Sequence, residues 1–280
     1  MGGLGNQMFE YAAAFAFAER TGRTIRFDTS FFAHDEFRRR FALDAFKLDV
    51  RNVGAAAHIR FRVLTWLAKR GLGRFLQAPK VLQDREEGYD PELFNVSSPV
   101  ILSGYWQSYR YSEGVEVPLR RRFEFRRKPP SAVAAWIERI ATLPNATALH
   151  VRRKDYVNNP GAARVHGCCD ANYYQRAVKQ LVEGGVQPHL FIFSDDPEWA
   201  QANLRFELPV NIVSGQGGWP DSEDLRMMVA CRHFIIANST FSWWAAWLGK
   251  RAGSIVIAPA RWYVGKQEPR DLVPLSWIRL

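Results

Sequence analysis

Short apolar runs and helical patterns alternate through the second half of the chain. Five apolar runs predict strands, at 146–149, 189–193, 210–213, 233–237 and 254–258, and the last of them is expected to close the sheet. Helical patterns lie between them, at 132–141, 173–182, 222–229 and 243–247, with a further short helix after 196. Strands that alternate with helices pair in parallel, so the fold class predicted for this half is α/β with a Rossmann-like parallel sheet.

The first half opens on a glycine-rich loop, Gly2-Gly3-Leu4-Gly5-Asn6-Gln7, which leads into an alanine-rich helix ending near Gly22. Glycines ahead of a helix let the backbone approach a phosphate or a sugar closely. Such a loop normally follows a buried strand, so a strand is expected ahead of Met1 and is missing from this sequence. Further strands are predicted at 24–28 and 99–106.

An aromatic cluster and a basic run complete this half. Tyr105, Trp106, Tyr109 and Tyr111 suit stacking on a sugar, and core packing explains them equally well. Basic helical stretches are predicted between 58 and 69. The basic run at 120–128 precedes Pro129-Pro130, and prolines end regular structure. The chain is long enough for two cores, and the predicted domains are 1–130 and 131–280.

Composition restricts the class of partner. The net charge of +10 and the isoelectric point near 9.8 favour a nucleotide, a nucleic acid or an acidic membrane surface. The three cysteines, two of them adjacent, form no disulfide framework. No apolar run approaches the roughly 18 residues of a membrane helix, and no signal peptide opens the sequence. A cytoplasmic protein is expected, with peripheral membrane contact through basic residues as a further alternative.

Several candidate ligand-binding residues lie together in the run His150-Val151-Arg152-Arg153-Lys154-Asp155-Tyr156, which directly follows a predicted strand. Adjacent residues of a strand point to opposite faces, so one arginine can face a ligand while a carboxylate holds the other. Asp155 is the nearby candidate for that carboxylate. Arginine offers a planar fork of donors that matches phosphate oxygens. The alternative is a solvated surface pair.

Two other predicted strands also end in polar groups, Ser194-Asp195-Asp196 and Asn238-Ser239-Thr240, the latter with Ser242. The carboxyl ends of parallel strands share one edge of a sheet, where ligands bind, so these groups should meet the arginines there. Hydroxyls with free helix N–H groups suit a phosphate, and a carboxylate suits a guanine edge or a ribose hydroxyl. Helix capping and a turn before Pro197 are the structural alternatives. Asp195-Asp196 alone is weak evidence for a divalent metal, and no spacing resembles a zinc site.

Together these motifs resemble the alpha-1,2-fucosyltransferases of glycosyltransferase family 11, in order from Gly2 to about Trp262. The segments that carry the resemblance are 2–9, 104–108, 150–156, 193–196 and 237–246. The resemblance implies a GT-B fold of two Rossmann-like domains, with GDP-fucose bound mainly by the C-terminal domain and the acceptor by the N-terminal one. It also implies an inverting, metal-independent transfer of L-fucose to the 2-hydroxyl of a galactoside. Lys154 departs from the family, which usually has glycine at this position.

The resemblance also implies roles. Arg152 is expected to bind the diphosphate and to stabilise the charge that develops as GDP leaves. His150 should line the nucleotide pocket, Asp195 should read guanine, and Asn6 should reach the reacting centre from the other domain. Asp155 beside two guanidinium groups would be a poor base and is expected to orient an arginine.

The predicted catalytic residues are Arg152, Asn6 and Asp155. The predicted donor-binding residues are Gly3, Gly5, Asn6, His150, Arg152, Arg153, Asp195, Asp196, Asn238, Ser239, Thr240 and Ser242. No metal and no other cofactor is expected, because GDP-fucose is the donor substrate. Two alternatives remain: another nucleotide-sugar transferase of the same fold, and a basic nucleic-acid-binding protein whose affinity falls steeply with salt.

Overall fold

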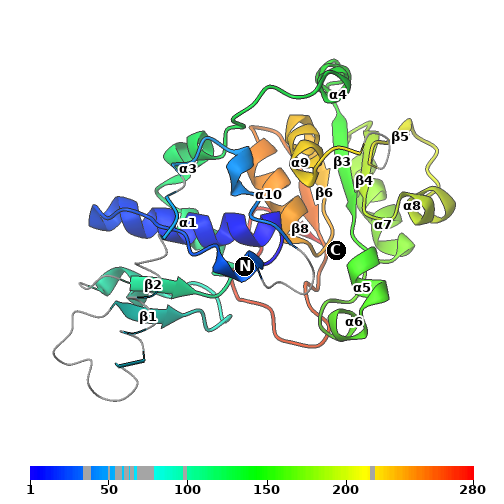
Figure 1. Ribbon diagram of the computed structural model, residues 1–280. Coiled ribbons are helices and arrows are strands. Elements are labelled where there is room, and N and C mark those ends of the chain that lie inside the picture. The colour runs from blue at the N-terminus through cyan, green and yellow to red at the C-terminus, as the bar shows by residue number, and fades with distance from the viewer. Residues whose placement is uncertain are drawn as a thin grey trace. The chain divides into compact units, whose positions relative to one another are not determined.

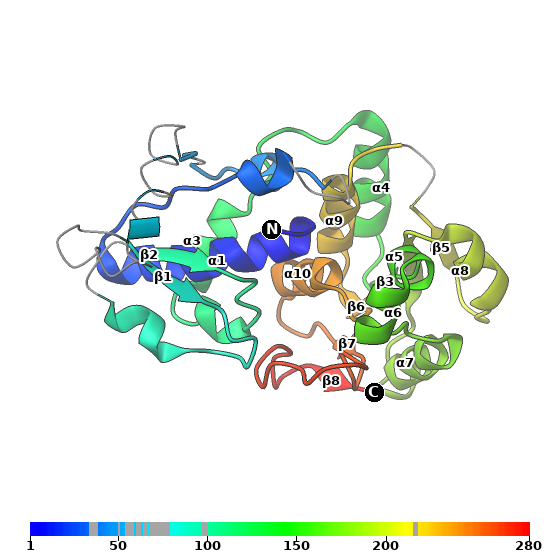
Figure 2. The same ribbon diagram turned by 60° about the horizontal axis from the view of Figure 1, so that its bottom comes forward.

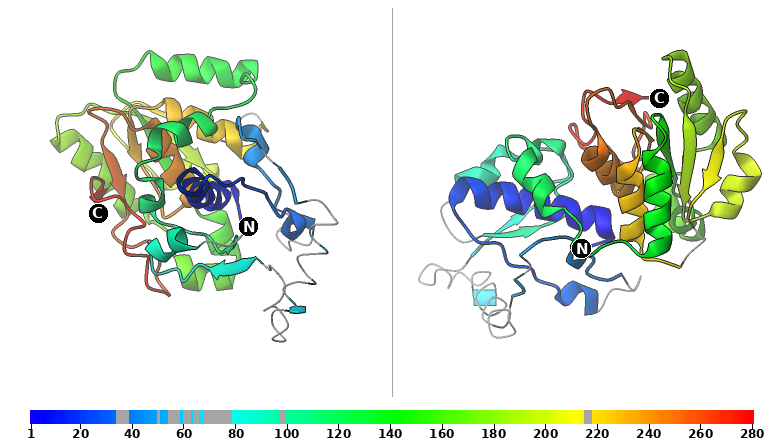
Figure 3. Two further views of the ribbon diagram at one scale, coloured as in Figure 1. Left: turned by 90° about the vertical axis from the view of Figure 1, so that its left-hand side faces the viewer. Right: turned by 90° about the horizontal axis from the view of Figure 1, so that it is seen from above.

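The computed structural model describes residues 1–33, 39–49, 51–53, 79–96, 100–214 and 218–280, together with residues 59, 63, 66 and 67. The chain divides into two compact units, and each is described by itself (Figure 3). Unit 1 comprises Met1–Arg126 and Pro269–Leu272, and unit 2 comprises Arg127–Glu268 and Val273–Leu280. The sequence placed the division at Pro130, four residues after the end of the first stretch of unit 1. A short return of the chain to unit 1 near its end was not predicted.

Unit 2 is built on a parallel sheet, which confirms the predicted α/β class (Figures 1 and 2). In spatial order its strands are β5 (Val210–Ile212), β4 (His189–Ser194), β3 (Ala146–Val151), β6 (His233–Ile235), β7 (Val256–Ala258) and β8 (Ile278–Arg279). The expectation that the strand near 254–258 closes the sheet is wrong, because Ile278 of β8 pairs with Ile257 beyond it. A two-residue strand carries no periodic pattern by which sequence could reveal it.

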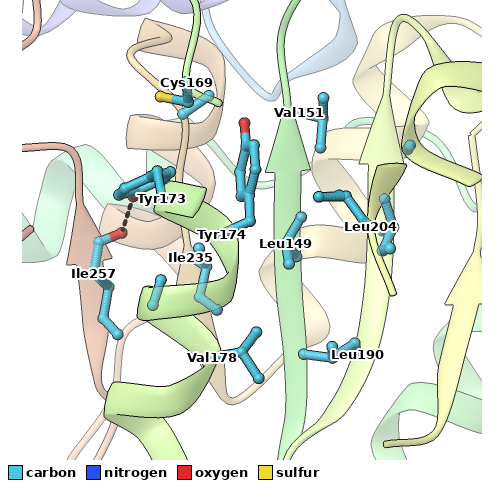
Figure 4. Packing of buried hydrophobic residues seen from close by; sticks show 14 of the residues in the cluster. Leu149, Val151, Cys169, Tyr173, Tyr174, Val178, Leu190, Leu204, Ile235 and Ile257 are labelled. Atoms are coloured by element: carbon cyan, nitrogen blue, oxygen red, sulfur yellow. Dashed lines mark hydrogen bonds between the residues drawn. The ribbon is translucent and has the colours of Figure 1, made fainter. Parts of the chain in front are cut away.

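Helices cover both faces of this sheet. They are α4 (Ser131–Ala141), α5 (Lys154–Asn158), α6 (Pro160–His166), α7 (Ala171–Glu183), α8 (Pro197–Asn203), α9 (Asp221–Ala230) and α10 (Thr240–Gly249). Alternate residues of β3 face opposite sides. Leu149 packs in one cluster with Tyr174 and Val178 of α7 (Figure 4), whereas His150 lies against Phe241 of α10.

Strand β3 is buried at all six positions, as expected for a strand covered on both faces. The Tyr173 hydroxyl of α7 donates to the carbonyl oxygen of Ile236 at 2.6 Å. It also donates to the carbonyl oxygen of Ile257 at 3.4 Å (Figure 4), and so ties the helix to the sheet. These contacts fix the strand ends that follow.

Unit 1 contains α1 (Leu4–Thr21), α3 (Glu116–Arg122) and the parallel strand pair β1 (Lys80–Gln83) and β2 (Val100–Ser103). Four short 3-10 helices are described as well: η1 (Ser30–Ala33), η2 (Leu43–Ala45), η4 (Pro91–Asn95) and η5 (Tyr109–Ser112). Helix α1 ends where predicted, since Gly22 takes the left-handed conformation that favours glycine, with φ 66°.

Two predictions for unit 1 have other outcomes. The strand predicted at 24–28 is reduced to a single bridge between Phe27 and Asn52. The basic helical stretch predicted between 58 and 69 falls mostly outside the described residues. Among the residues that the structure describes, no helix is long and apolar enough to cross a membrane.

Two side chains of the aromatic cluster lie in the core of unit 1. Trp106 and Tyr111 are buried and pack with Ala13 and Phe17 of α1, so core packing accounts for these two side chains. Strand β2 leads to them through a tight loop, in which the N–H groups of Tyr105 and Trp106 donate to Asp84 at 3.1 and 2.7 Å.

Candidate active site

Three polar segments meet at one edge of the unit 2 sheet. Val151 of β3 pairs with Ser194 of β4, and Leu149 of β3 pairs with Ile235 of β6, all in parallel. Parallel strands end on the same edge, so the segments 150–154, 194–196 and 238–242 follow the ends of adjacent strands. Their predicted gathering is confirmed by these registers.

The Asp195 carboxylate organises this edge. Its Oδ1 accepts from the backbone N–H of Arg153 at 2.8 Å, and its Oδ2 accepts from that of Lys154 at 3.1 Å. Arg152 Nε lies 3.4 Å from Oδ2. One carboxylate therefore holds both the start of α5 and an arginine. A guanine edge would have to share it with these donors, and the predicted guanine contact stays a prediction.

Arg153 is held by the segment that follows β4 and by α8. Its Nε lies 3.7 Å from Asp196 Oδ2, and its guanidinium stacks 4.0 Å from the ring centroid of Trp199 on α8. Asp196 in turn caps α8 by accepting from the Trp199 N–H at 3.3 Å. The Arg152 side chain is 31% exposed and that of Arg153 is 19% exposed, so Arg152 is the better placed of the two to meet a ligand.

Both arginines lie beside carboxylates of the segment after β4, so the prediction that one of them faces a ligand stays a prediction. The structure describes the backbone of Asp155 within α5, and its side chain lies outside the described residues. The predicted orienting role of Asp155 stays a prediction.

His150 is buried beside the α10 helix. Its ring lies 5.6 Å from that of Phe241, and within the described part of the chain its Nδ1 has no hydrogen-bond partner. Desolvation, with a smaller contribution from Arg152, lowers the pKa of His150 to about 3. The imidazole is therefore neutral near pH 7 and can donate or accept one hydrogen bond toward an uncharged ring edge.

The start of α10 has the features of an anion site. Ser239 is the N-cap residue, and its side chain makes no capping hydrogen bond, so the capping alternative does not account for it. Its carbonyl accepts from the Trp243 N–H at 3.0 Å and from the Ser242 hydroxyl at 3.2 Å. Thr240 is the first helical residue and is half-buried. N–H groups at such a helix start attract phosphate oxygens.

Asn238 joins this edge to the neighbouring loops. Its Nδ2 donates to the carbonyl oxygens of His166, Gly167 and Trp262 at 2.8, 3.3 and 3.2 Å. The backbone carbonyl of Asn238 accepts from the Tyr156 hydroxyl at 3.1 Å. Asn238 and Ser242 are both buried and use their side chains internally. The predicted contacts of these two residues with a ligand stay predictions. In this structure their side chains hold the neighbouring loops and the start of α10 in place.

Sequence reasoning missed a second half-buried carboxylate near this edge. Asp224 of α9 accepts from Ser214 Oγ at 2.6 Å and from Trp219 Nε1 at 2.7 Å, and burial raises its pKa. Ser214 follows β5, so this network anchors the loop at the next strand end. The acidic start of the predicted helix at 222 was the available signal. Ser214 and Trp219, the partners of Asp224, precede the helix in the chain and belong to no motif.

The glycine loop belongs to unit 1. Gly2 has φ 71° and precedes the N-cap residue Gly3, and a Cβ at Gly2 would lie 2.6 Å from Asn6 Nδ2. Gly5 is buried in the first turn of α1. Asn6 Oδ1 accepts from Gln107 Nε2 at 3.1 Å, so two motifs 101 residues apart meet. The predicted approach of Asn6 to the reacting centre of the other domain stays a prediction.

Within the described ranges, no group of three or more histidine, cysteine, aspartate or glutamate side chains lies close enough to hold an ion.

Comparisons with known proteins agree with the motifs. The family described as Glycosyl transferase family 11 matches residues 94–279, roughly two thirds of the chain. The O-antigen biosynthesis glycosyltransferase WbnK of Escherichia coli is 28% identical over 297 residues, covering 100% of this chain and 98% of the relative. An alpha-1,2-colitosyltransferase of Escherichia coli is 29% identical over 287 residues, covering 100% and 96%.

More distant matches extend to animals and plants. Galactoside alpha-(1,2)-fucosyltransferase 2 of Oryctolagus cuniculus is 23% identical over 254 residues, covering 89% of this chain and 65% of the relative. Among solved structures, a mutant of Arabidopsis thaliana FUT1 in complex with GDP has a TM-score of 0.51 at 13% identity, covering 92% of this chain and 68% of that one. At this identity the match shows a shared fold.

Proposed function

The chain belongs to glycosyltransferase family 11 and has a GT-B type fold, and we propose that it transfers L-fucose from GDP-fucose to the 2-hydroxyl of a terminal galactoside, with inversion at the transferred sugar. Two kinds of relative support the 1,2 linkage: one is named as an alpha-1,2-colitosyltransferase, and others are named as galactoside alpha-(1,2)-fucosyltransferases. The structural relative FUT1 was solved with GDP, which supports a guanine nucleotide.

One observation carries the proposal: Arg152 stands at the end of β3, and the uncapped start of α10 follows the adjacent strand β6. When GDP leaves, negative charge develops on the β-phosphate. A guanidinium and the N–H groups of a helix start are both donors suited to that charge. Because Asp195 fixes the guanidinium in advance, little reorganisation is needed as the charge grows.

The nucleotide base would meet His150 and the loop that Asp195 holds. A neutral imidazole adds no positive charge beside Arg152, and it leaves one nitrogen able to donate and one able to accept. This suits the mixed donor and acceptor edge of a purine. The alternative of a nucleic-acid-binding protein is set aside, because the chain belongs to a family of transferases.

We propose that the reaction requires no metal ion. In enzymes that use one, the cation neutralises the leaving diphosphate. In this protein Arg152 and the N–H groups at the start of α10 can stabilise the leaving diphosphate in place of a cation. The Asp195 carboxylate already accepts from two backbone N–H groups and contacts Arg152, so its oxygens are committed to donors of the protein.

Binding and transfer test the proposal separately. GDP and GDP-fucose should raise Tm in a concentration-dependent way, whereas UDP should not, because ligands that bind only the folded state stabilise it. Transfer should occur to a β-galactoside and be lost with the matched 2-deoxygalactoside. Equal stabilisation by UDP, or equal transfer to the 2-deoxy acceptor, would contradict the proposal.

A second donor is favoured by one relative. The alpha-1,2-colitosyltransferase matches the whole chain at 29% identity, so colitose is the competing sugar to transfer. Initial rates with GDP-fucose and GDP-colitose at equal concentration decide between them. A higher kcat/KM with GDP-colitose would replace fucose in the proposal and leave the roles of Arg152 and His150 unchanged.

A further inference from the structure

Helix α5 is hydrogen-bonded to the segments that follow both neighbours of β3 in the sheet. At the start of the helix, the N–H groups of Arg153 and Lys154 donate to Asp195, which follows β4. Further along, the Tyr156 hydroxyl donates to the backbone carbonyl oxygen of Asn238, which follows β6, at 3.1 Å. This short helix therefore links the strand ends on either side of β3.

The hydrogen bond from Tyr156 holds the peptide group that leads into α10. That group joins Asn238 to Ser239, the N-cap residue of the helix. Its carbonyl oxygen accepts from Tyr156, and its N–H donates to the carbonyl oxygen of Ala237 at 2.8 Å. Because a peptide group is planar, hydrogen bonds at its two ends fix its orientation. The first turn of α10 starts from this fixed group.

A column of side chains holds Tyr156 in turn. Its ring lies 4.8 Å from that of His166, and the two planes are nearly parallel, at 7°. The His166 ring lies 5.2 Å from that of Tyr263, and Lys266 Nζ lies 4.3 Å from the Tyr263 centroid. Stacking needs only the ring, so phenylalanine at 156 would keep it. The hydroxyl is the part of Tyr156 that reaches the start of α10.

The side chain of Asn238 is held separately from its backbone. Its Nδ2 donates to the carbonyl oxygens of His166, Gly167 and Trp262. These bonds do not involve the Tyr156 hydroxyl. Loss of that hydroxyl should therefore leave Asn238 in place and release one end of the peptide group that follows it.

We propose that Tyr156 is a positioning residue for the transfer reaction, whose hydroxyl sets the start of α10 at the spacing from Arg152 that the leaving diphosphate requires. The inference rests on the proposed function at one point, the contact of both groups with that diphosphate. Donors stabilise a developing charge best when they are held in place before it forms. A displacement of about 1 Å can cost about 100-fold in rate, so a single hydrogen bond that fixes the spacing has a measurable effect.

Tyr156→Phe tests this role, with Tyr173→Phe as the matched control. Both changes remove a phenol hydroxyl that donates to a main-chain carbonyl of the segment 236–238. Tyr156→Phe should lower kcat about tenfold and leave Tm within about 3 °C of wild type, because the stacking on His166 is retained. Tyr173→Phe should lower Tm and leave kcat within about twofold of wild type, because its hydroxyl is buried against the sheet. Near-normal kcat in Tyr156→Phe would overturn the proposal.

A double-mutant cycle separates positioning from a general loosening of the fold. If Tyr156 sets the spacing between the start of α10 and Arg152, its effect should shrink once the planar contact of Arg152 is lost. In an Arg152→Lys background, Tyr156→Phe should therefore lower kcat only about twofold. An undiminished tenfold loss in that background would show that Tyr156 acts independently of Arg152 and would overturn the proposal.

Hydrogen exchange measures the positioning itself and does not depend on the sugar transferred. Residues 239–243 should exchange faster in Tyr156→Phe than in wild type or in Tyr173→Phe, because the start of α10 opens more readily. Unchanged exchange in this segment would overturn the proposal. If the wild-type protein transfers another sugar in place of fucose, only the proposed donor is wrong, and the same four rates are compared with the donor that is used.

Discussion

Arg152 Nε and Asp195 Oδ2 lie 3.4 Å apart at the edge where strands β3 and β4 end. The same carboxylate accepts the N–H groups of Arg153 and Lys154. The position of the arginine is therefore coupled to the backbone that begins α5. We infer that Asp195 acts through Arg152 as a positioning residue.

Asp195→Asn tests that coupling. An amide keeps the shape but has one accepting oxygen in place of two, so we expect the free energy of unfolding to fall by about 1–3 kcal/mol. We also expect kcat to fall by about tenfold or more, because Arg152 loses its anchor. Denaturant unfolding and initial rates measure the two effects. Asp196→Asn is the matched control: asparagine can still cap α8, so the change should only weaken the ion pair with Arg153 and leave kcat near wild type.

The lowered pKa of buried His150 predicts that the free energy of unfolding depends on pH. Its pKa is about 3 in the folded protein and near 6.5 when unfolded. Between these values the unfolded state binds a proton that the folded state does not, so stability should fall as pH falls below about 6.5. His150→Gln removes this contribution, and its unfolding free energy should decline less than that of wild type between pH 7 and pH 5. Equal declines in guanidinium unfolding would show that His150 is not held neutral by burial.

Metal independence gives a third prediction. Excess chelator should leave most of the activity intact, since in our proposal Arg152 and the N–H groups at the start of α10 supply the positive charge at the leaving group. The measurement is the initial rate before and after chelation, and after readdition of magnesium or manganese. Complete loss that either ion restores would identify a metal requirement and return Asp195 and Asp196 to consideration as ligands.

The sequence predicted much of unit 2 because parallel strands buried on both faces are continuous apolar runs, and β3 and β4 are of this kind. It missed β1 because three of its four residues are exposed, so no apolar pattern marks it. It missed β8 because two residues at a sheet edge carry no pattern. Tertiary pairing alone defines both strands.

The candidate site was predictable in composition and less so in its contacts. The gathering of His150, Arg152 and Asp195 follows from strand ends that share one edge. Asp155, two residues away, was the expected partner of Arg153, and its side chain lies outside the described residues. The structure places Asp196 beside Arg153, because the Val151–Ser194 register brings the two segments together. The bonds from two backbone N–H groups to Asp195 span 42 and 41 residues, and spacing along the chain cannot reveal them.

The central claim is that Arg152 stabilises the departing diphosphate. Lysine offers a point charge in place of the planar fork, so Arg152→Lys should recover little of what Arg152→Ala loses. By analogy with other preorganised donors to a developing oxyanion, Arg152→Ala should lower kcat on the order of 100-fold or more. Arg153→Ala is the control. Because that side chain lies between Asp196 and Trp199, its main effect should be a lower Tm.

The most direct measurement is the initial rate of all four proteins with GDP-fucose and a β-galactoside, alongside their melting curves. The expected result is a loss of kcat in both Arg152 variants at a Tm close to wild type, because a contact that strengthens as charge develops affects turnover more than donor binding. Near-normal turnover in Arg152→Lys would contradict the two-donor contact, and near-normal turnover in Arg152→Ala would remove Arg152 from the mechanism.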